Sequence, residues 1–185
     1  DEYFVTTSDY RAGNYTFSEC LDLAIRESYN GCADPMRADN TLSQYAETFI
    51  TELELNNTTD LGLYSTASDL TKLLIHVWQH SDLSDQSWQK LSDSMLYQPP
   101  TTIDSETVYN WRQGLPSGFS DQVSIYDKVG WAWDGEKWSV YADVSILEFS
   151  TKNRHYTAAI LTIDLSDTAV LTTLSEKIES AISTS

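Results

Sequence analysis

Three stretches in the last third of the chain alternate between apolar and polar residues, and this period of two constrains the fold more than any other feature. They are rich in Val, Ile, Tyr and Trp and cover 123–133, 138–149 and 155–163. Short turns that contain Asp134-Gly135 and Lys152-Asn153 separate them. Alternating segments joined by short turns are typical of antiparallel β-strands. The sequence therefore predicts a three-stranded antiparallel sheet.

Helical spacing of apolar residues dominates the region before Pro99-Pro100. The predicted helices cover 17–28, 34–53, 65–78 and 88–96, with Thr16 or Ser18 as the cap of the first, breaks at Asn30-Gly31 and 56–60, and a cap at Ser65. A last amphipathic helix with Val170 and Ile182 on one stripe follows a cap at Ser166-Asp167. We predict an α+β fold of the α/β sandwich type. It forms a single domain over 1–185, with a mainly helical lobe at 16–98 and the sheet plus C-terminal helix at 120–185.

Composition excludes several classes of protein. The chain has 11 basic and 28 acidic residues, a net charge of −17, which repels phosphate backbones and anionic lipid headgroups and excludes nucleic-acid binding. A hydrophobic content of 41% is too high for a disordered acidic tail. No apolar run approaches the roughly 20 residues that span a bilayer. The sequence predicts a globular domain without a membrane-spanning segment.

Cys20 and Cys32 are the only cysteines, so a thiolate metal site is excluded and at most one internal disulfide can form. If Cys20 opens the helix that ends at Ser28, eight residues of helix advance about 12 Å. A disulfide requires Cα atoms within about 7 Å, so we expect the two thiols to be unbonded. His76 and His80 lie four residues apart on one helix, but they lack a third ligand. We predict no metal and no cofactor.

Two polar groups could carry chemistry. Ser28-Tyr29-Asn30 places a hydroxyl and an amide at a predicted helix end, where the alternative is an ordinary C-terminal turn. Lys128 stands two residues before Gly130 on the first strand, so it can place a cation beside bare backbone. The alternative is an exposed lysine that guards an edge strand.

The order of these motifs resembles the serine β-lactamase and penicillin-binding-protein family, in a class A-like form. The succession covers about residues 14–183 and consists of Phe17-Ser18-Glu19-Cys20-Leu21, Ser28-Tyr29-Asn30, Ser65-Thr66-Ala67-Ser68-Asp69-Leu70, Arg112-Gln113-Gly114-Leu115-Pro116 and Asp127-Lys128-Val129-Gly130-Trp131. In that family a serine of an S-x-x-K motif is acylated by a β-lactam or a D-alanyl peptide. The resemblance implies a β-lactamase-like fold and acyl-enzyme chemistry.

The resemblance also implies catalytic and substrate-binding roles. Ser28 matches the serine of the S-x-N motif, which passes a proton to the leaving nitrogen. Asn30 matches the amide that holds the side-chain carbonyl of the substrate. Lys128 matches the lysine of K-T-G, which stabilises the substrate carboxylate and favours proton transfer through Ser28.

Three further substrate-binding positions follow from the same match. Gly130 lets the strand backbone approach the substrate, and the N–H of Trp131 is one oxyanion-hole donor. Val129 replaces the Thr or Ser of K-T-G. The chain therefore lacks the side-chain hydroxyl that would donate a hydrogen bond to the substrate carboxylate. We therefore expect weaker substrate binding than in relatives with the hydroxyl.

The chain departs from the family at its nucleophile. No S-x-x-K string precedes Ser28, and Ser87-Trp88-Gln89-Lys90 lies downstream, where we interpret it as a surface pattern. Glu52 fits the Glu-x-x-Leu-Asn string of the deacylating loop, but it falls in a predicted helix and is interpreted as a surface residue. We expect a β-lactamase-like or penicillin-binding-protein-like hydrolase portion that is inactive by itself. The alternative is a non-catalytic cell-surface module that kept the fold and lost the chemistry.

Partners and location follow from this interpretation. The expected ligand is a β-lactam or a peptidoglycan peptide, and the expected location is extracellular or at the cell surface. In the family the sheet has five strands, so the apolar strand 155–163 is left as an edge. We expect it to pair with an N-terminal fragment of the parent protein or a second copy of the chain, or to be covered by residues 1–13.

Overall fold

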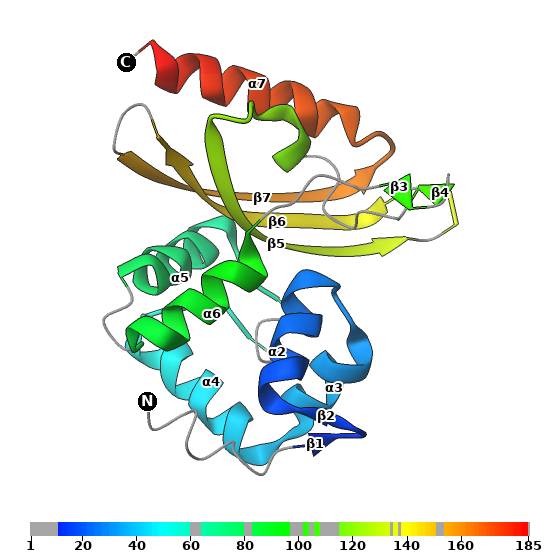
Figure 1. Cartoon of the computed structure of the whole chain (residues 1–185), viewed down its shortest axis with the longest axis vertical. Helices are drawn as coiled ribbons and strands as arrows, with labels where there is room; N and C mark the ends of the chain where they lie inside the picture. The colour runs from blue at the N-terminus through cyan, green and yellow to red at the C-terminus, as the bar shows by residue number, and fades with distance from the viewer. Residues whose placement is uncertain are drawn as a thin grey trace. The chain divides into compact units, whose positions relative to one another are not determined.

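A computed structural model describes two units of the chain, which divide between Met95 and Leu96 (Figure 1). The described residues are 11–59, 64–79, 83–96, 102–103, 106–107, 115–133, 135–136, 138–150 and 154–184. Each unit has its own sheet and helices. In the described ranges no helix is long and apolar enough to cross a membrane. The observed α+β class confirms the predicted fold class.

The N-terminal unit consists of a short hairpin followed by helices. Its elements are β1 (Arg11–Ala12), β2 (Tyr15–Thr16), α2 (Phe17–Arg26), α3 (Asn30–Ala38), α4 (Asn40–Glu52), α5 (Ala67–Gln79) and α6 (Asp85–Met95). The helices expected at 65–78 and 88–96 are confirmed as α5 and α6. Asp22 on α2 accepts hydrogen bonds from Arg26 at 3.2 Å and from Ser94 on α6 at 2.7 Å, so these two helices are tied together.

The single helix expected over 34–53 is two helices. The chain is helical from Asn30, with Pro35 inside α3, and Asp39 separates α3 from α4. Asp39 has extended backbone, and its carboxylate accepts the N–H groups of Thr41 and Leu42 at 2.9 and 3.0 Å. A side chain that satisfies the free N–H groups of a new helix favours a break at that residue. Asn30-Gly31, expected to be the break, instead opens α3.

Cys20 and Cys32 form a disulfide with Cα atoms 5.0 Å apart, so the prediction that they are unbonded is wrong. That prediction assumed a helix that continues to Ser28, whereas α2 ends before it. Ser28 has a φ of 51°, and the N–H of Tyr29 donates to the carbonyl of Leu23 at 3.1 Å. The chain has therefore folded back beside α2 before α3 begins, which returns Cys32 to Cys20.

Asp69 on α5 holds the segment before that helix. Its carboxylate is 2% exposed and accepts the N–H of Asn57 at 2.8 Å and the hydroxyl of Thr58 at 3.1 Å. The hydroxyl of Thr66, rather than that of Ser65, accepts the N–H of Asp69 at 3.2 Å. The expected cap is thus displaced by one residue. Ser65 instead shares a hydrogen bond with the Thr58 hydroxyl at 2.8 Å.

The C-terminal unit contains the predicted sheet. Its elements are β3 (Thr102–Ile103), β4 (Glu106–Thr107), the 3-10 helix η2 (Pro116–Gly118), β5 (Val123–Trp133), β6 (Trp138–Phe149), β7 (Arg154–Leu165) and α7 (Ala169–Ser183). The three long strands are antiparallel in the order β5-β6-β7, and α7 lies across one face of their sheet (Figure 1). The three expected strands and the last helix are confirmed. The carboxylate of Asp167 accepts the N–H of Ala169 at 2.8 Å at the start of α7.

Alternate residues of the strands supply the core beneath α7. The pairs Val123↔Phe149 and Ile125↔Leu147 place four buried side chains on that face. They pack with Phe119 and with the apolar stripe of α7. Lys128 and Gly130 occupy the intervening positions and lie on the other face of the sheet.

β7 pairs with β6 and, within the described residues, with no other strand. Ile163 is 82% exposed and Leu161 is 42% exposed on it. Exposed apolar side chains on an edge strand favour pairing with another chain. The expected additional partner of this strand stays a prediction.

We predict that the start of α2 is sensitive to acid through Glu19. The Glu19 carboxylate accepts the N–H of Thr16 at 2.8 Å, and the Thr16 hydroxyl accepts the N–H of Glu19 at 3.3 Å, a capping box. Hydrogen bonds from the backbone and then the side chain of Thr16 lower the pKa of Glu19. A carboxyl with a lowered folded-state pKa stabilises the fold above its unfolded-state pKa, and this contribution is lost as pH falls through the folded-state value.

An NMR titration of the Glu19 side chain tests this prediction. Thr16→Ala removes the hydroxyl but keeps the N–H, so it should raise the pKa of Glu19 part of the way toward its ordinary value. Ser18→Ala is the matched control, because Ser18 was the alternative cap and lies outside the capping box. An unchanged Glu19 pKa in Thr16→Ala would contradict the assignment.

Candidate active site

Ser28 lies in a strained turn at the junction of α2 and α3. Its φ of 51° is in the left-handed region, which costs a residue with a side chain roughly 1–2 kcal/mol. The side chain is half-buried. Strained backbone that the surrounding structure holds in place is common at functional sites. A left-handed residue directly after a helix is also the usual C-terminal turn, so the functional interpretation of Ser28 stays a prediction.

Asn30 follows as the first residue of α3 and is exposed. Tyr29 between them is the N-cap of α3, but its side chain makes no capping hydrogen bond. Ser28 and Asn30 thus share one short connection between α2 and α3.

Lys128 lies on β5 opposite Val144 and is half-buried on the face away from α7. Its ammonium donates to the carbonyl of Val129. The Val129 side chain is 2% exposed and packs in the core with Leu115, Tyr141 and Leu171. The Val129 side chain is therefore directed into the core and not toward the Lys128 face.

Gly130 leaves open space at the surface of β5. A Cβ atom at this position would have no neighbour within 4 Å among the described residues. The backbone of Trp131 pairs with Tyr141 across β5 and β6, and its side chain lies outside the described part. The geometry leaves room for a ligand to approach the strand backbone at Gly130.

The site residues fall into two sets. Ser28 and Asn30 belong to the N-terminal unit, and Lys128 to Trp131 belong to the C-terminal unit. Since the units are described separately, the convergence of Ser28, Asn30 and Lys128 on one ligand stays a prediction.

Sequence analysis missed two buried carboxylates behind Lys128. Asp127 and Asp143 are both 0% exposed on the face that α7 covers. Asp143 accepts hydrogen bonds from Ser145 at 2.6 Å and from the Tyr141 hydroxyl at 3.4 Å. Burial, followed by the charges of Asp143 and then Asp127, raises the pKa of Tyr141. The signal in the sequence was an Asp at an inward position of each of two apolar strands.

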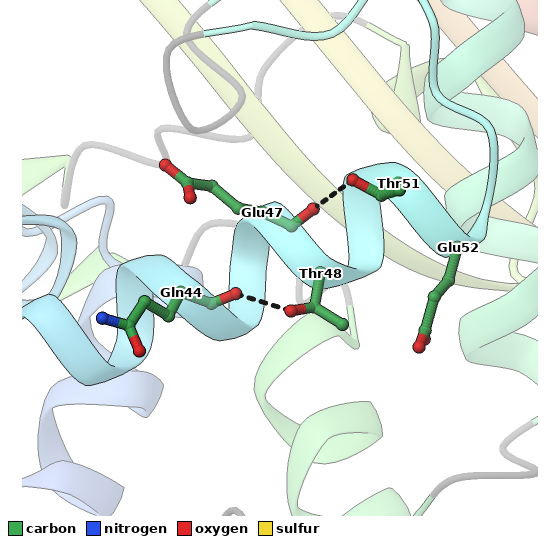
Figure 2. A pocket seen from close by; sticks show the side chains of 5 residues that line it. All are labelled: Gln44, Glu47, Thr48, Thr51 and Glu52. Carbon is green, nitrogen blue, oxygen red and sulfur yellow. Dashed lines mark hydrogen bonds between the residues drawn. The ribbon is translucent and has the colours of Figure 1, made fainter.

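Glu52 is the last residue of α4 and is exposed, as its interpretation as a helical surface residue predicted. It lines a surface hollow of about 530 Å³ whose described lining residues all come from α4: Gln44, Glu47, Thr48, Thr51 and Glu52 (Figure 2). The hydroxyls of Thr48 and Thr51 donate to helix carbonyls at 2.8 and 2.9 Å. These two hydroxyls are thus committed to the helix backbone.

The remaining candidate residues have structural contacts. His76 packs edge to face against Phe49 at 5.8 Å between ring centroids, and His80 lies outside the described residues. Ser87 is 8% exposed and bonds with the Ser84 hydroxyl at 3.0 Å, so its expected surface position is wrong, whereas Lys90 is exposed. The reason is that Ser87 lies in the first turn of α6, where its N–H also donates to Ser84. Among the described side chains, no three of His, Cys, Asp or Glu are grouped to hold a metal.

A helical unit is followed by a three-stranded antiparallel sheet with α7 across one face, and this order of elements defines the class of β-lactamase-like proteins. Residues 5–183 match the model of the Beta-lactamase enzyme family, and the chain belongs to this family. No curated protein matches the sequence.

Solved structures show the same fold. A variant of the TLA-1 extended-spectrum β-lactamase aligns with a TM-score of 0.67 and 17% identity over 91% of this chain and 64% of that chain. A class A β-lactamase from Bacteroides cellulosilyticus aligns at 0.68 and 14% over 92% and 65%. PBP-A aligns at 0.67 and 20% over 92% and 63%, as does a PBP-A mutant solved as an acyl-enzyme complex with penicillin G. This chain therefore spans less than two thirds of each of these structures.

We predict that Gly130→Ala leaves the fold intact, because the added Cβ has no described neighbour within 4 Å. Gly118→Ala is the contrasting variant, since its Cβ would lie 2.2 Å from the Thr172 carbonyl on α7. Overpacking of this kind costs about 1–3 kcal/mol of unfolding free energy. Urea unfolding should show a lower midpoint for Gly118→Ala alone. Equal destabilisation of both variants would contradict the open space at Gly130.

We also predict that removal of the Lys128 charge affects the S-x-N turn. If Ser28, Asn30 and Lys128 converge on one ligand as predicted, the Lys128 charge lies within about one Debye length, roughly 10 Å, of both amides and alters the field there. Lys128→Met should therefore shift the amide resonances of Ser28 and Asn30. Lys177→Met, at an exposed position of α7, is the charge-matched control and should leave both resonances in place. If Lys128→Met moves neither resonance, the two sets do not form one site.

Proposed function

We propose that the chain is part of a serine hydrolase that acts on β-lactams or D-alanyl peptides through an acyl-enzyme. The observation that carries the proposal is the half-buried Lys128 on β5, with open space beside Gly130, in a chain whose residues 5–183 match the family model. A cation beside accessible backbone suits a ligand with a carboxylate and a reactive carbonyl.

Ser28 and Lys128 are the proposed catalytic residues. In the acylation step the serine of an S-x-x-K motif attacks the amide carbonyl, and the C–N bond of the amide breaks. Ser28 passes the proton to the leaving nitrogen, and the Lys128 charge favours that transfer. Water then hydrolyses the acyl ester. Because this chain has no S-x-x-K before Ser28, we propose that the nucleophile is supplied by the parent protein.

Asn30, Val129, Gly130 and Trp131 are the proposed substrate-binding residues. Asn30 holds the side-chain carbonyl of the substrate, and the Trp131 N–H donates to the oxyanion. Gly130 permits close approach of the ligand. Val129 contributes through its backbone, because its side chain is buried in the core.

The proposed location is extracellular or at the cell surface. The Cys20–Cys32 disulfide supports it, since disulfides persist in oxidising compartments and are rare in the cytosol. The peptidoglycan peptides that the family acts on are also outside the cytoplasm.

A non-catalytic binding module is the second candidate. One observation favours it: Val129 replaces the hydroxyl-bearing residue of K-T-G. Such a module would bind a peptide or β-lactam carboxylate at Lys128 without forming an ester.

Fluorescent penicillin distinguishes the two candidates. The parent protein should form a covalent adduct, and the 185-residue chain should form none. Lys128→Met in the parent should slow labelling by about 10²-fold or more, the usual effect of losing an electrostatic catalytic group, whereas Lys177→Met should label normally. An unlabelled parent would support the binding module, and a labelled 185-residue chain would show that the nucleophile lies within it.

A further inference from the structure

The Cys20–Cys32 disulfide encloses the S-x-N turn. It joins α2 to α3, and both cysteines are 0% exposed in a small core with Ala12. The sequence separation of 12 between them contains Ser28 and Asn30. A covalent bond at this place limits how far the ends of the turn can separate.

The turn needs such a restraint because Ser28 is in the left-handed region. Two N–H groups, those of Glu27 and Tyr29, share the Leu23 carbonyl at 3.0 and 3.1 Å. The N–H of Cys32 donates to the Tyr29 carbonyl at 3.0 Å. The disulfide thus closes a compact loop whose hydrogen bonds run from Leu23 through Tyr29 to one of the bonded cysteines.

The Tyr29 ring restrains the turn from the other side. A Cβ atom on Gly31 would lie 2.5 Å from the ring carbon Cζ of Tyr29, so the ring occupies the space that a side chain would need. Tyr15 on β2 packs edge to face on the same ring, with centroids 6.2 Å apart. Tyr29 is therefore held between Tyr15 and the bare backbone of Gly31.

We propose that Cys20, Cys32 and Tyr29 are positioning residues for the S-x-N turn. The disulfide and the Tyr29 ring hold Ser28 in its left-handed conformation and so fix its hydroxyl relative to the Asn30 amide. The catalytic meaning of this positioning rests on the proposed function. The restraint on the turn does not, because it follows from the contacts alone.

Amide hydrogen exchange of the full 185-residue chain tests the restraint. In a Cys20→Ala, Cys32→Ala double variant, the Tyr29 amide should exchange about 10- to 100-fold faster, because a local opening is no longer limited by the bond. Amides of α5 should be unaffected. Met36→Ala is the matched control, because it removes packing from the same core but keeps the disulfide, and it should leave Tyr29 protected. Unchanged Tyr29 exchange in the double variant, or equal acceleration throughout α2 to α6, would overturn the proposal.

Variants of Tyr29 separate positioning from general stability. Tyr29→Ala should accelerate exchange of the Cys32 amide, and Tyr29→Phe, which keeps the ring, should restore protection. Gly31→Ala should resemble Tyr29→Ala, because the new Cβ displaces the ring. Equal exchange in Tyr29→Ala and Tyr29→Phe would overturn the role of the ring.

Penicillin labelling of the parent then tests the catalytic meaning. Tyr29→Ala should lower the acylation rate at saturating penicillin, and Tyr29→Phe should not. If Tyr29→Ala labels at the normal rate while its turn exchanges rapidly, the positioning role in catalysis is overturned. If the unmodified parent is not labelled, the proposed function fails, whereas the exchange data still decide the restraint.

Discussion

The register of β5 against β6 determines where every candidate residue of the C-terminal unit lies. Asp127 pairs with Ser145 and Val129 with Asp143, so these side chains face α7, and Lys128 opposite Val144 faces the other way. A slip of one residue would exchange the two faces, which would bury the Lys128 ammonium beneath α7. The buried apolar pairs Val123↔Phe149 and Ile125↔Leu147, which pack beneath α7, oppose that slip. Packing on one face of the sheet thus fixes the chemistry of the other.

The same register places two carboxyl groups inside the sheet. Asp127 and Asp143 are fully buried on the α7 side of the strands. Removing carboxylates from water is costly, and the hydroxyls of Ser145 and Tyr141 offset part of that cost at Asp143. Lys128 is the next residue after Asp127, so the strand carries a cation on one face and a carboxylate on the other. The electrostatic environment of Lys128 therefore depends partly on Asp127, which lies on the core side of the same strand.

The N-terminal unit depends on a reversal of direction at Ser28. The pattern of apolar residues indicated a helix there, but it did not reveal that the helix ends before Ser28 and that Tyr29 folds back to Leu23. An error of two residues in a helix end was enough to reverse the conclusion about Cys20 and Cys32. Sequence periodicity locates a helix well and its ends poorly, because the end depends on which groups satisfy the last carbonyls.

Local patterns determined several elements of this chain: period-two segments predicted the three long strands, and an apolar stripe predicted α7. The order of short motifs indicated the family. The strands and α7 were predictable because the periods of 2 and 3.6 follow from backbone geometry alone. Only the tertiary structure decided that Val129 is buried, that Asp127 and Asp143 lie behind Lys128, and that Cys20 is bonded to Cys32. Each of these depends on contacts between segments far apart in the chain or on one left-handed residue. No local period encodes such distant contacts or such a left-handed residue, because the spacing of a residue along its own element does not specify what packs against it.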